Sequence, residues 1–430
     1  MSTDTATGAA AASGPRPLGA IDRWARRALA RHRLSELRGG RLVVDDAEGS
    51  RVFGDTGADL RARIIVHDPR FYRRSVLGGS LGAAAAYLDG DWDCDDLAAL
   101  FRIVLRSERA MARLEGGPAR LVSGLARIGH ALRRNTRGGS RRNIRDHYDL
   151  GNDLFALFLD PSMTYSAGAF DTPGMTLEAA QFAKLDRICQ KLDLRPEHHV
   201  LEIGTGWGSF ALHAARHYGC RVTTTTISAA QAELARERIA AAGLEDRITL
   251  LTEDYRNLEG QYDRLVSIEM IEAVGHHYLE TFFRVCGERL HDDGRMLLQV
   301  IVAGDDWYDD YRGTVDFIQR YVFPGALCPS IGALSAALGR ARSGLRMADA
   351  EDLTEDYAET LRHWRRRFHA RADEVRALGY PQRFLRLWDY YLQYCEAGFA
   401  ERHTGDLQIV LDKPGCRLPP VRPRLAEAPA

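Results

Sequence analysis

The feature that most constrains the fold of this chain is a strand that runs directly into a glycine-rich turn and a helix. Residues 200–208 read Val-Leu-Glu-Ile-Gly-Thr-Gly-Trp-Gly. Glycines let the backbone approach a ligand closely, and the start of the following helix offers free N–H groups. We therefore expect a ligand-binding α/β domain built around this turn.

Strands and helices alternate on both sides of the turn. The apolar pattern predicts helices at 178–192, 207–218 and 229–242, and strands at 199–203, 221–226, 248–252, 262–268 and 295–301. Such alternation is typical of a mostly parallel, doubly wound sheet. Beyond residue 329 the sequence predicts a helical cap with one late strand at 407–411. The expected fold is α/β and Rossmann-like.

Length and charge limit the classes of protein to consider. The 430 residues leave room for two or three domains. With 58 Lys and Arg against 59 Asp and Glu, the balance argues against a dedicated nucleic-acid binder. No run of 18 apolar residues occurs, and the seven cysteines form no CxxC pair. These features predict a cytoplasmic protein without a transmembrane helix or secretory signal.

Changes in composition predict four segments. Residues 1–17 are expected to be disordered, and 18–105 to form a small α/β domain with a helix at 21–32 and strands at 41–45 and 62–67. The connecting segment 106–145 holds eleven Arg and two acidic residues with apolar residues at helical spacing. It is either a dock for anionic membranes or a solvated linker. Residues 146–430 form the predicted catalytic domain.

The glycine turn departs from the dinucleotide-binding pattern in two ways. Its third glycine comes too early, and the second strand ends in Thr223–Thr226 where that pattern needs an acidic residue. An acidic residue, Glu202, instead lies inside the first strand. This arrangement favours a class I methyltransferase that uses S-adenosylmethionine. An NAD oxidoreductase and a purely structural turn are the alternatives.

Residues on either side of the turn carry a resemblance to a known family. Residues 145–155 read Arg-Asp-His-Tyr-Asp-Leu-Gly-Asn-Asp-Leu-Phe, and 159–166 read Leu-Asp-Pro-Ser-Met-Thr-Tyr-Ser. Shorter pieces match in the same order: 183–185, 201–208, 227–228 with Gln231, 254–256, 270–275, 321–324 and 390–392 leading into Cys395. Over residues 143–412 the chain closely resembles the cyclopropane fatty acid synthases.

The resemblance implies a reaction and its partners. In that family a methyl group passes from S-adenosylmethionine to the cis double bond of an acyl chain in a membrane phospholipid. A base then removes a proton from the new methyl as the ring closes. Residues 18–105 look like the accessory domain of the phospholipid-acting members. We expect an enzyme that is peripheral at the inner face of the membrane, with unsaturated phospholipids as partners and a homodimer as a candidate assembly.

The resemblance also assigns a site for S-adenosylmethionine. The implied residues are Tyr165 and Ser166 at the methionine end, Glu202, Gly204 and Gly206 at the turn, Thr226 and Gln231 on the ribose side, and Asp254 and Tyr255 at the adenine. No metal site is assigned. His276 and His277 are adjacent, and the side chains of adjacent histidines rarely converge on one ion.

The implied base site departs from the family pattern. The family holds a bicarbonate with a Cys, a Glu, a His and a Tyr. Here Glu272 matches, but Ala167, Gln299 and Arg365 stand at the other three positions. Either Gln299 and Arg365 still hold an anion and a ring forms, or the cation loses its proton elsewhere and the product is methylene- or methyl-branched.

Cys395 aligns with a cysteine long regarded as catalytic in that family, so it joins Glu272, Gln299 and Arg365 as a catalytic candidate. A buried cysteine on an apolar helix is more often part of the core. An alternative of a different class is a lipid-binding protein without activity, prompted by the altered base site. A methyltransferase for soluble small molecules is a further alternative.

Overall fold

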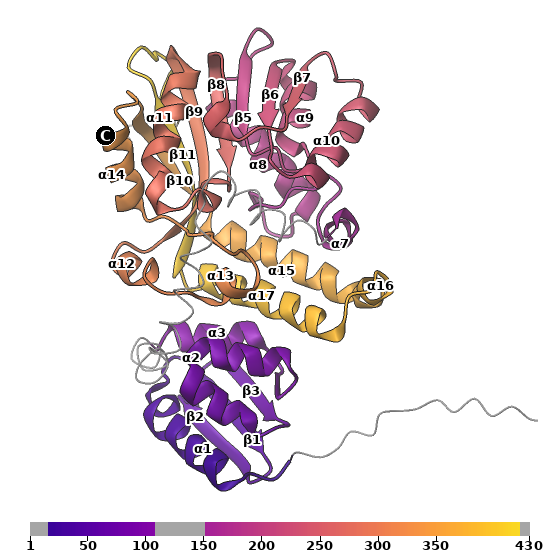
Figure 1. The fold of residues 1–430 in the computed structure, drawn as a ribbon, viewed down its shortest axis with the longest axis vertical. Helices are drawn as coiled ribbons and strands as arrows, with labels where there is room; N and C mark the ends of the chain where they lie inside the picture. Colours follow the sequence, from indigo (N-terminus) through magenta and orange to yellow (C-terminus); the bar gives the residue numbers. More distant parts are fainter. Residues whose placement is uncertain (1–15, 108–150, 422–430) are drawn as a thin grey trace, which may run out of the picture. The chain divides into compact units, whose positions relative to one another are not determined.

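The computed structural model describes residues 16–107 and 151–421, in two units that span residues 1–122 and 123–430 (Figure 1). Residues 1–15 of the predicted disordered start and residues 108–145 of the basic segment lie outside the described residues. Within the two described ranges, no helix combines the length and the apolar character needed to cross a membrane.

The first unit is a four-stranded sheet with helices on one face. Its strands are β1 (Arg41–Asp46), β2 (Gly49–Gly54), β3 (Arg61–Val66) and β4 (Trp92–Cys94), in the order β2-β1-β3-β4. Its helices are α1 (Ala20–His32), α2 (Arg70–Leu88) and α3 (Leu97–Leu105), with a 3₁₀ turn η1 (Leu34–Glu36). Alternate residues of β3 are buried and exposed, as expected for a sheet covered on one side.

Two strands of this unit were not predicted from the sequence. In β2 the first four residues are exposed, so this edge strand lacks an apolar alternation. Strand β4 has only three residues. The predicted small α/β domain therefore contains a larger sheet than the sequence pattern indicates.

The second unit contains the predicted Rossmann-like sheet. Its seven strands are β5 (His199–Ile203), β6 (Arg221–Thr225), β7 (Ile248–Leu251), β8 (Tyr262–Ile268), β9 (Leu290–Ala303), β10 (Arg346–Asp352) and β11 (Thr404–Asp412). Their order is β10-β11-β9-β8-β5-β6-β7, and the five strands from β5 to β9 are parallel. Strand β11 is antiparallel to both of its neighbours.

Each face of this sheet is covered by a separate set of helices. Helices α8 (Leu177–Lys191), α9 (Ser209–Tyr218) and α10 (Ala229–Ala241) pack on one face. Helices α11 (Leu279–Arg289) and α14 (Ile331–Ala341) pack on the other. Successive residues of a strand point to opposite faces of the sheet. Val200 packs in the core on the first face, and Leu201 packs in the core on the other. The central strands are therefore apolar on both sides.

Further helices form the predicted cap. Helices α15 (Thr354–Ala370) and α17 (Gln382–Ala400) lie side by side, linked by α16 (Ala372–Ala377) (Figure 1). The shorter helices are α7 (Asn152–Phe158), α12 (Tyr308–Tyr311) and α13 (Phe317–Tyr321), with 3₁₀ turns η2 (Tyr255–Asn257), η3 (Ile271–Ala273) and η4 (His276–Tyr278). The expectation of a single late strand was wrong, because the polar edge strand β10 precedes α15.

Candidate active site

The residues predicted to bind a cofactor lie where parallel strands end. Gly204 follows β5, Thr226 follows β6, and Asp254 comes shortly after β7. Glu269 and Glu272 follow β8. Since these strands are parallel, their carboxyl ends share one edge of the sheet, which is where ligands bind in open α/β folds.

The turn after β5 requires glycine. Gly204 has φ 107°, and a Cβ there would lie 3.1 Å from the side chain of Met270. Gly206 has φ 51°, and no heavy atom lies within 4 Å of its Cβ position. Gly208, with φ 87°, precedes α9, which explains why this helix begins at Ser209 and not at the predicted Trp207. The turn is thus shaped by backbone conformations that other residues rarely adopt.

Glu202 lies beneath the turn and does not project freely from it. The Thr224 hydroxyl donates to the Glu202 carboxylate at 2.6 Å, and both side chains are buried. Burial raises the pKa of Glu202 to about 8. Nearby, the fully buried Lys184 donates from Nζ to Ser166 Oγ at 2.7 Å, and burial lowers the pKa of Lys184 to about 8. Glu202 and Ser166 therefore belong to the polar support of the turn.

The segment that contains Tyr165 is anchored to the turn by specific contacts. Trp207 donates to Asn152 at 2.8 Å, and Arg238 donates to the backbone oxygens of Trp207 and Ser162. Tyr165 itself shares a hydrogen bond of 2.8 Å with Tyr391. The stretch around residues 152–166 that carries the family resemblance thus closes against the glycine turn.

The other predicted cofactor residues are partly engaged with neighbouring side chains. Thr226 donates to Gln231 at 3.1 Å. Asp254 pairs with Arg256 at 2.6 Å. The Tyr255 hydroxyl is buried without a hydrogen-bond partner in the described part of the chain. Tyr255 therefore retains a polar atom that a ligand could satisfy.

Glu272 has one oxygen occupied and one left over. The Ile301 N–H donates to Glu272 Oε1 at 2.6 Å, whereas Oε2 is buried and finds no partner among the described residues. Burial, together with the neighbouring Glu269, raises the pKa of Glu272 to about 8. At neutral pH this side chain is mostly a neutral acid with an unused polar atom.

Gln299 is bound on all sides by the protein itself. Its Nε2 donates to Glu269 Oε1 at 2.8 Å and to Asp406 Oδ2 at 2.9 Å. Its Oε1 accepts from Gln408 at 3.1 Å. An amide nitrogen has two hydrogens, so none is left for an added anion.

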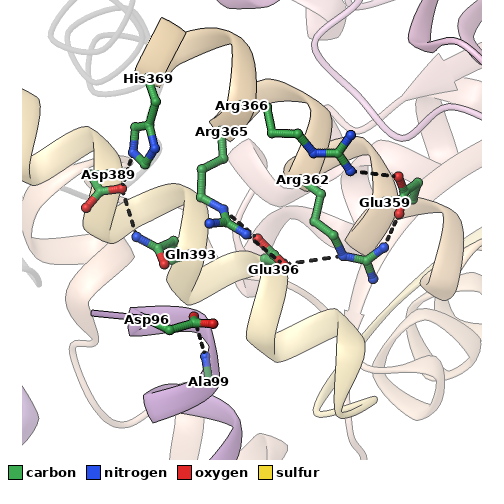
Figure 2. A network of polar contacts seen from close by, with 10 residues as sticks. All are labelled: Asp96, Ala99, Glu359, Arg362, Arg365, Arg366, His369, Asp389, Gln393 and Glu396. Atoms are coloured by element: carbon green, nitrogen blue, oxygen red, sulfur yellow. Dashed lines mark hydrogen bonds and ion pairs between the residues drawn. The ribbon is translucent and has the colours of Figure 1, made fainter. Parts of the chain in front are cut away.

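Arg365 is also engaged away from the glutamates that follow β8. On α15 its guanidinium points to Glu396 of α17, with distances of 3.0 and 3.4 Å, and Arg362 joins the same carboxylate (Figure 2). The ion pair ties the two cap helices together. Arg365 thus has a structural partner.

The described residues do not fit a bicarbonate. Ala167 offers no side-chain donor, and its N–H already binds Glu269 at 2.9 Å. Gln299 and Arg365 are engaged as described, which leaves only Glu272 of the four positions. The hypothesis that Gln299 and Arg365 hold an anion is therefore at odds with this geometry.

Cys395 lies on α17. Burial raises the pKa of its thiol, and the nearby Asp316 carboxylate adds to the rise. The thiolate is the nucleophilic form of cysteine, so the geometry gives no support for a nucleophilic role at neutral pH.

Sequence reasoning missed Glu269 and Asp406, which bind Gln299, and Tyr357, which binds Glu269. The Tyr357 hydroxyl donates to Glu269 Oε2 at 2.7 Å. A signal for Glu269 was present, because it directly follows a predicted parallel strand. Asp406 and Tyr357 had no such signal, since they come from β11 and α15.

Comparison with known proteins gives consistent matches. Residues 135–409 match the family model described as mycolic acid cyclopropane synthetase. The chain is 38% identical to tuberculostearic acid methyltransferase UfaA1 of Mycobacterium tuberculosis, over 87% of this chain and 88% of that protein. It is 38% identical to cyclopropane-fatty-acyl-phospholipid synthase of Escherichia coli K12, over 85% and 90%. The crystal structure of mycolic acid cyclopropane synthase CmaA1 complexed with SAH and CTAB aligns with a TM-score of 0.60 at 30% identity, over 64% of this chain and 98% of that one.

Proposed function

The chain belongs to the mycolic acid cyclopropane synthetase family of S-adenosylmethionine-dependent C-methyltransferases, and we propose that it methylates the double bond of an unsaturated acyl chain in a phospholipid. The observation that carries this proposal is the glycine turn with Gly204 at φ 107°, closed by the Tyr165 segment beside two glutamates.

The reaction does not need a nucleophilic side chain of the protein, because the double bond of the acyl chain is the nucleophile. S-adenosylmethionine supplies an electrophilic methyl group. The electron pair of the double bond forms the new carbon–carbon bond as the carbon–sulfur bond breaks, S-adenosylhomocysteine leaves, and a cation remains on the acyl chain. The protein must align the two substrates and exclude water.

Aromatic side chains near Tyr165 support an acyl-chain substrate. Phe323 lies 6.5 Å from Tyr165 and 6.1 Å from Tyr391 between ring centroids, and Trp364 lies 5.2 Å from Tyr165. Such rings suit an apolar chain, and their faces attract a cation.

The phospholipid form of the substrate rests on the N-terminal part of the chain. A match over 85% of this chain is longer than the second unit, so the similarity to the Escherichia coli phospholipid enzyme includes part of the first unit. Helix α1 also exposes Ile21 and Trp24, as expected of a surface that contacts lipid.

A second candidate differs in the product. The engaged Gln299 and Arg365 favour a reaction whose cation does not close to a ring, which gives a methylene- or methyl-branched chain. The methyl transfer itself is the same in both cases.

Mass spectrometry of lipids after incubation with S-adenosylmethionine and vesicles tests the proposal. Phospholipids with cis-monounsaturated chains should gain one CH2 unit in the acyl chain, and vesicles with saturated chains should not. Mild hydrogenation then separates the products, since a methylene takes up two hydrogens and a ring resists. If a free fatty acid or a sphingolipid gained the CH2 unit and phospholipid did not, the result would contradict the proposed substrate.

A further inference from the structure

Charge balance in the proposed reaction requires a proton acceptor. The cation left on the acyl chain becomes a neutral product only when a C–H bond gives up its proton to a base. The inference below rests on the proposed function, because without methyl transfer no such proton is released. The acceptor must be ionised before the reaction, and part of it must be accessible to substrate.

Glu269 is placed and held for such a task. It is the first residue after β8, with φ 46°, a left-handed conformation that is uncommon outside glycine. Its Oε1 accepts from the Ala167 N–H at 2.9 Å and from Gln299 at 2.8 Å. Its Oε2 accepts from Tyr357 at 2.7 Å and keeps a second lone pair. Unlike Gln299, it is only partly buried.

The surrounding groups favour the ionised form of Glu269 over that of its acidic neighbours. Burial raises the pKa of both Glu269 and Asp406, but Glu269 has three donors, whereas Asp406 shares one of them and leaves Oδ1 without a partner in the described ranges. The Lys184 ammonium favours the charged form of both carboxyl groups, so the difference between them lies in their hydrogen bonds. The hydrogen bonds therefore favour Glu269 as the ionised member of this pair and Asp406 as the protonated one.

Other candidates near the site are less suitable. Glu272, with a pKa of about 8, is mostly protonated at neutral pH. Asp316 caps α13, where it accepts the backbone N–H of Gln319 at 2.8 Å. Burial keeps Cys395 as a thiol.

Two of the positions implied to hold a bicarbonate instead hold Glu269. The backbone of Ala167 and the side chain of Gln299 both donate to one oxygen of its carboxylate. A carboxylate and a bicarbonate present the same planar O–C–O group. The chain thus carries the chemical equivalent of the anion as one of its own side chains.

We propose that the Glu269 carboxylate accepts the proton released after methyl transfer and that no bound bicarbonate is needed. The C–H bond breaks, its electron pair completes the new carbon–carbon bond of a ring or an alkene, and the proton goes to Glu269 Oε2. Solvent takes the proton once the product has left.

The test uses the full-length chain and the variants Glu269→Gln and Glu269→Ala, with phospholipid vesicles in buffer free of carbon dioxide. The Glu269→Gln variant should bind S-adenosylmethionine within about 3-fold of the unchanged protein but lose about 10²–10⁴-fold in product formation. Added formate or bicarbonate should partly restore Glu269→Ala, because each can enter the space left by the side chain. A matched control is Glu359→Gln on the far side of α15, which should behave like the unchanged protein.

Three results would overturn the proposal. One is unchanged product formation in Glu269→Gln, and another is a requirement of the unchanged protein for added bicarbonate. The third is loss of S-adenosylmethionine binding in both variants, which would make Glu269 a structural residue. If the unchanged protein methylates no unsaturated lipid under any condition, the proposed function fails first, and that outcome is distinct from these three.

Discussion

At the scale of single residues, the site depends on ionisable side chains that are buried beneath the glycine turn. Glu202 and Lys184 are both buried, and each has a pKa of about 8 in the folded protein. In the unfolded chain Glu202 titrates near its ordinary value of 4.5. The folded state therefore binds the extra proton between these values, and stability falls as the pH rises from about 4.5 to about 8.

This relation predicts the behaviour of Glu202→Gln. Glutamine does not titrate, so the variant should not show the fall in folding stability that Glu202 causes. Between pH 5 and pH 8 its free energy of unfolding should therefore rise by a few kcal/mol relative to that of the unchanged protein. Lys184 acts in the opposite sense, but only above about pH 8. Denaturant unfolding at several pH values measures the difference, and the exposed Glu197→Gln is the control. Parallel curves for Glu202→Gln and the unchanged protein would contradict the assignment.

The contacts of single residues also explain why the role of Glu269 was not predicted from the sequence. Its role depends on Ala167, Gln299 and Tyr357, which are far apart in the sequence and meet only in the fold. The glycine turn and the Tyr165 stretch were predictable because each is a contiguous motif. The end of the predicted strand 262–268 marks the position of Glu269, but its partners come from three other segments and leave no local pattern.

At the scale of elements, the turn between β5 and α9 is the most restrictive connection. At Gly204 a side chain would adopt a strained φ of 107° and press on Met270 at 3.1 Å. We predict that Gly204→Ala weakens S-adenosylmethionine binding by at least about 10-fold and costs about 1–3 kcal/mol of stability.

Calorimetry and thermal unfolding measure both effects. Gly174→Ala is the matched control, because Gly174 also has a positive φ, 80°, but no atom within 4 Å of its Cβ position. It should lose stability without losing affinity. Equal affinity in Gly204→Ala and Gly174→Ala would show that the turn does not approach the ligand.

Buried and edge elements differ in how well the sequence predicts them. The bounds of β5 and β8 agree with the apolar pattern, since both strands lie inside the sheet and bury both faces. Strands β2 and β10 are edges with mostly exposed or partly exposed residues, so nothing in their sequence distinguishes them from loops. The central strands were therefore predictable, whereas the polar edge strands β2 and β10 were not; the edge strand β7, which is more apolar, was predicted at 248–252 and is found at Ile248–Leu251.

At the scale of the whole molecule, the proposed reaction on a phospholipid needs access to a lipid surface. On α1 the exposed fractions are 67% for Ile21 and 56% for Trp24, and Arg27 and Arg31 are exposed on the same helix. Aromatic and basic side chains together suit the interface of an anionic membrane.

We predict that Ile21→Ser combined with Trp24→Ser weakens binding to anionic vesicles by about 10-fold or more. An apolar side chain that becomes buried in the membrane contributes about 1.5–3 kcal/mol to binding. Vesicle sedimentation measures the binding. The control is Val52→Ser, an exposed apolar residue on β2. If the double variant and Val52→Ser bind vesicles equally, α1 is not the contact surface.

The most direct test of the account follows the methyl group itself. Full-length protein is incubated with S-adenosylmethionine carrying a trideuterated methyl and with unsaturated phospholipid vesicles, in buffer free of carbon dioxide. We predict deuterium in the acyl chain, as a CD2 unit when the new methyl loses a deuteron, with the same yield after bicarbonate is added. An acyl chain without deuterium, while S-adenosylmethionine binds normally, would contradict the account.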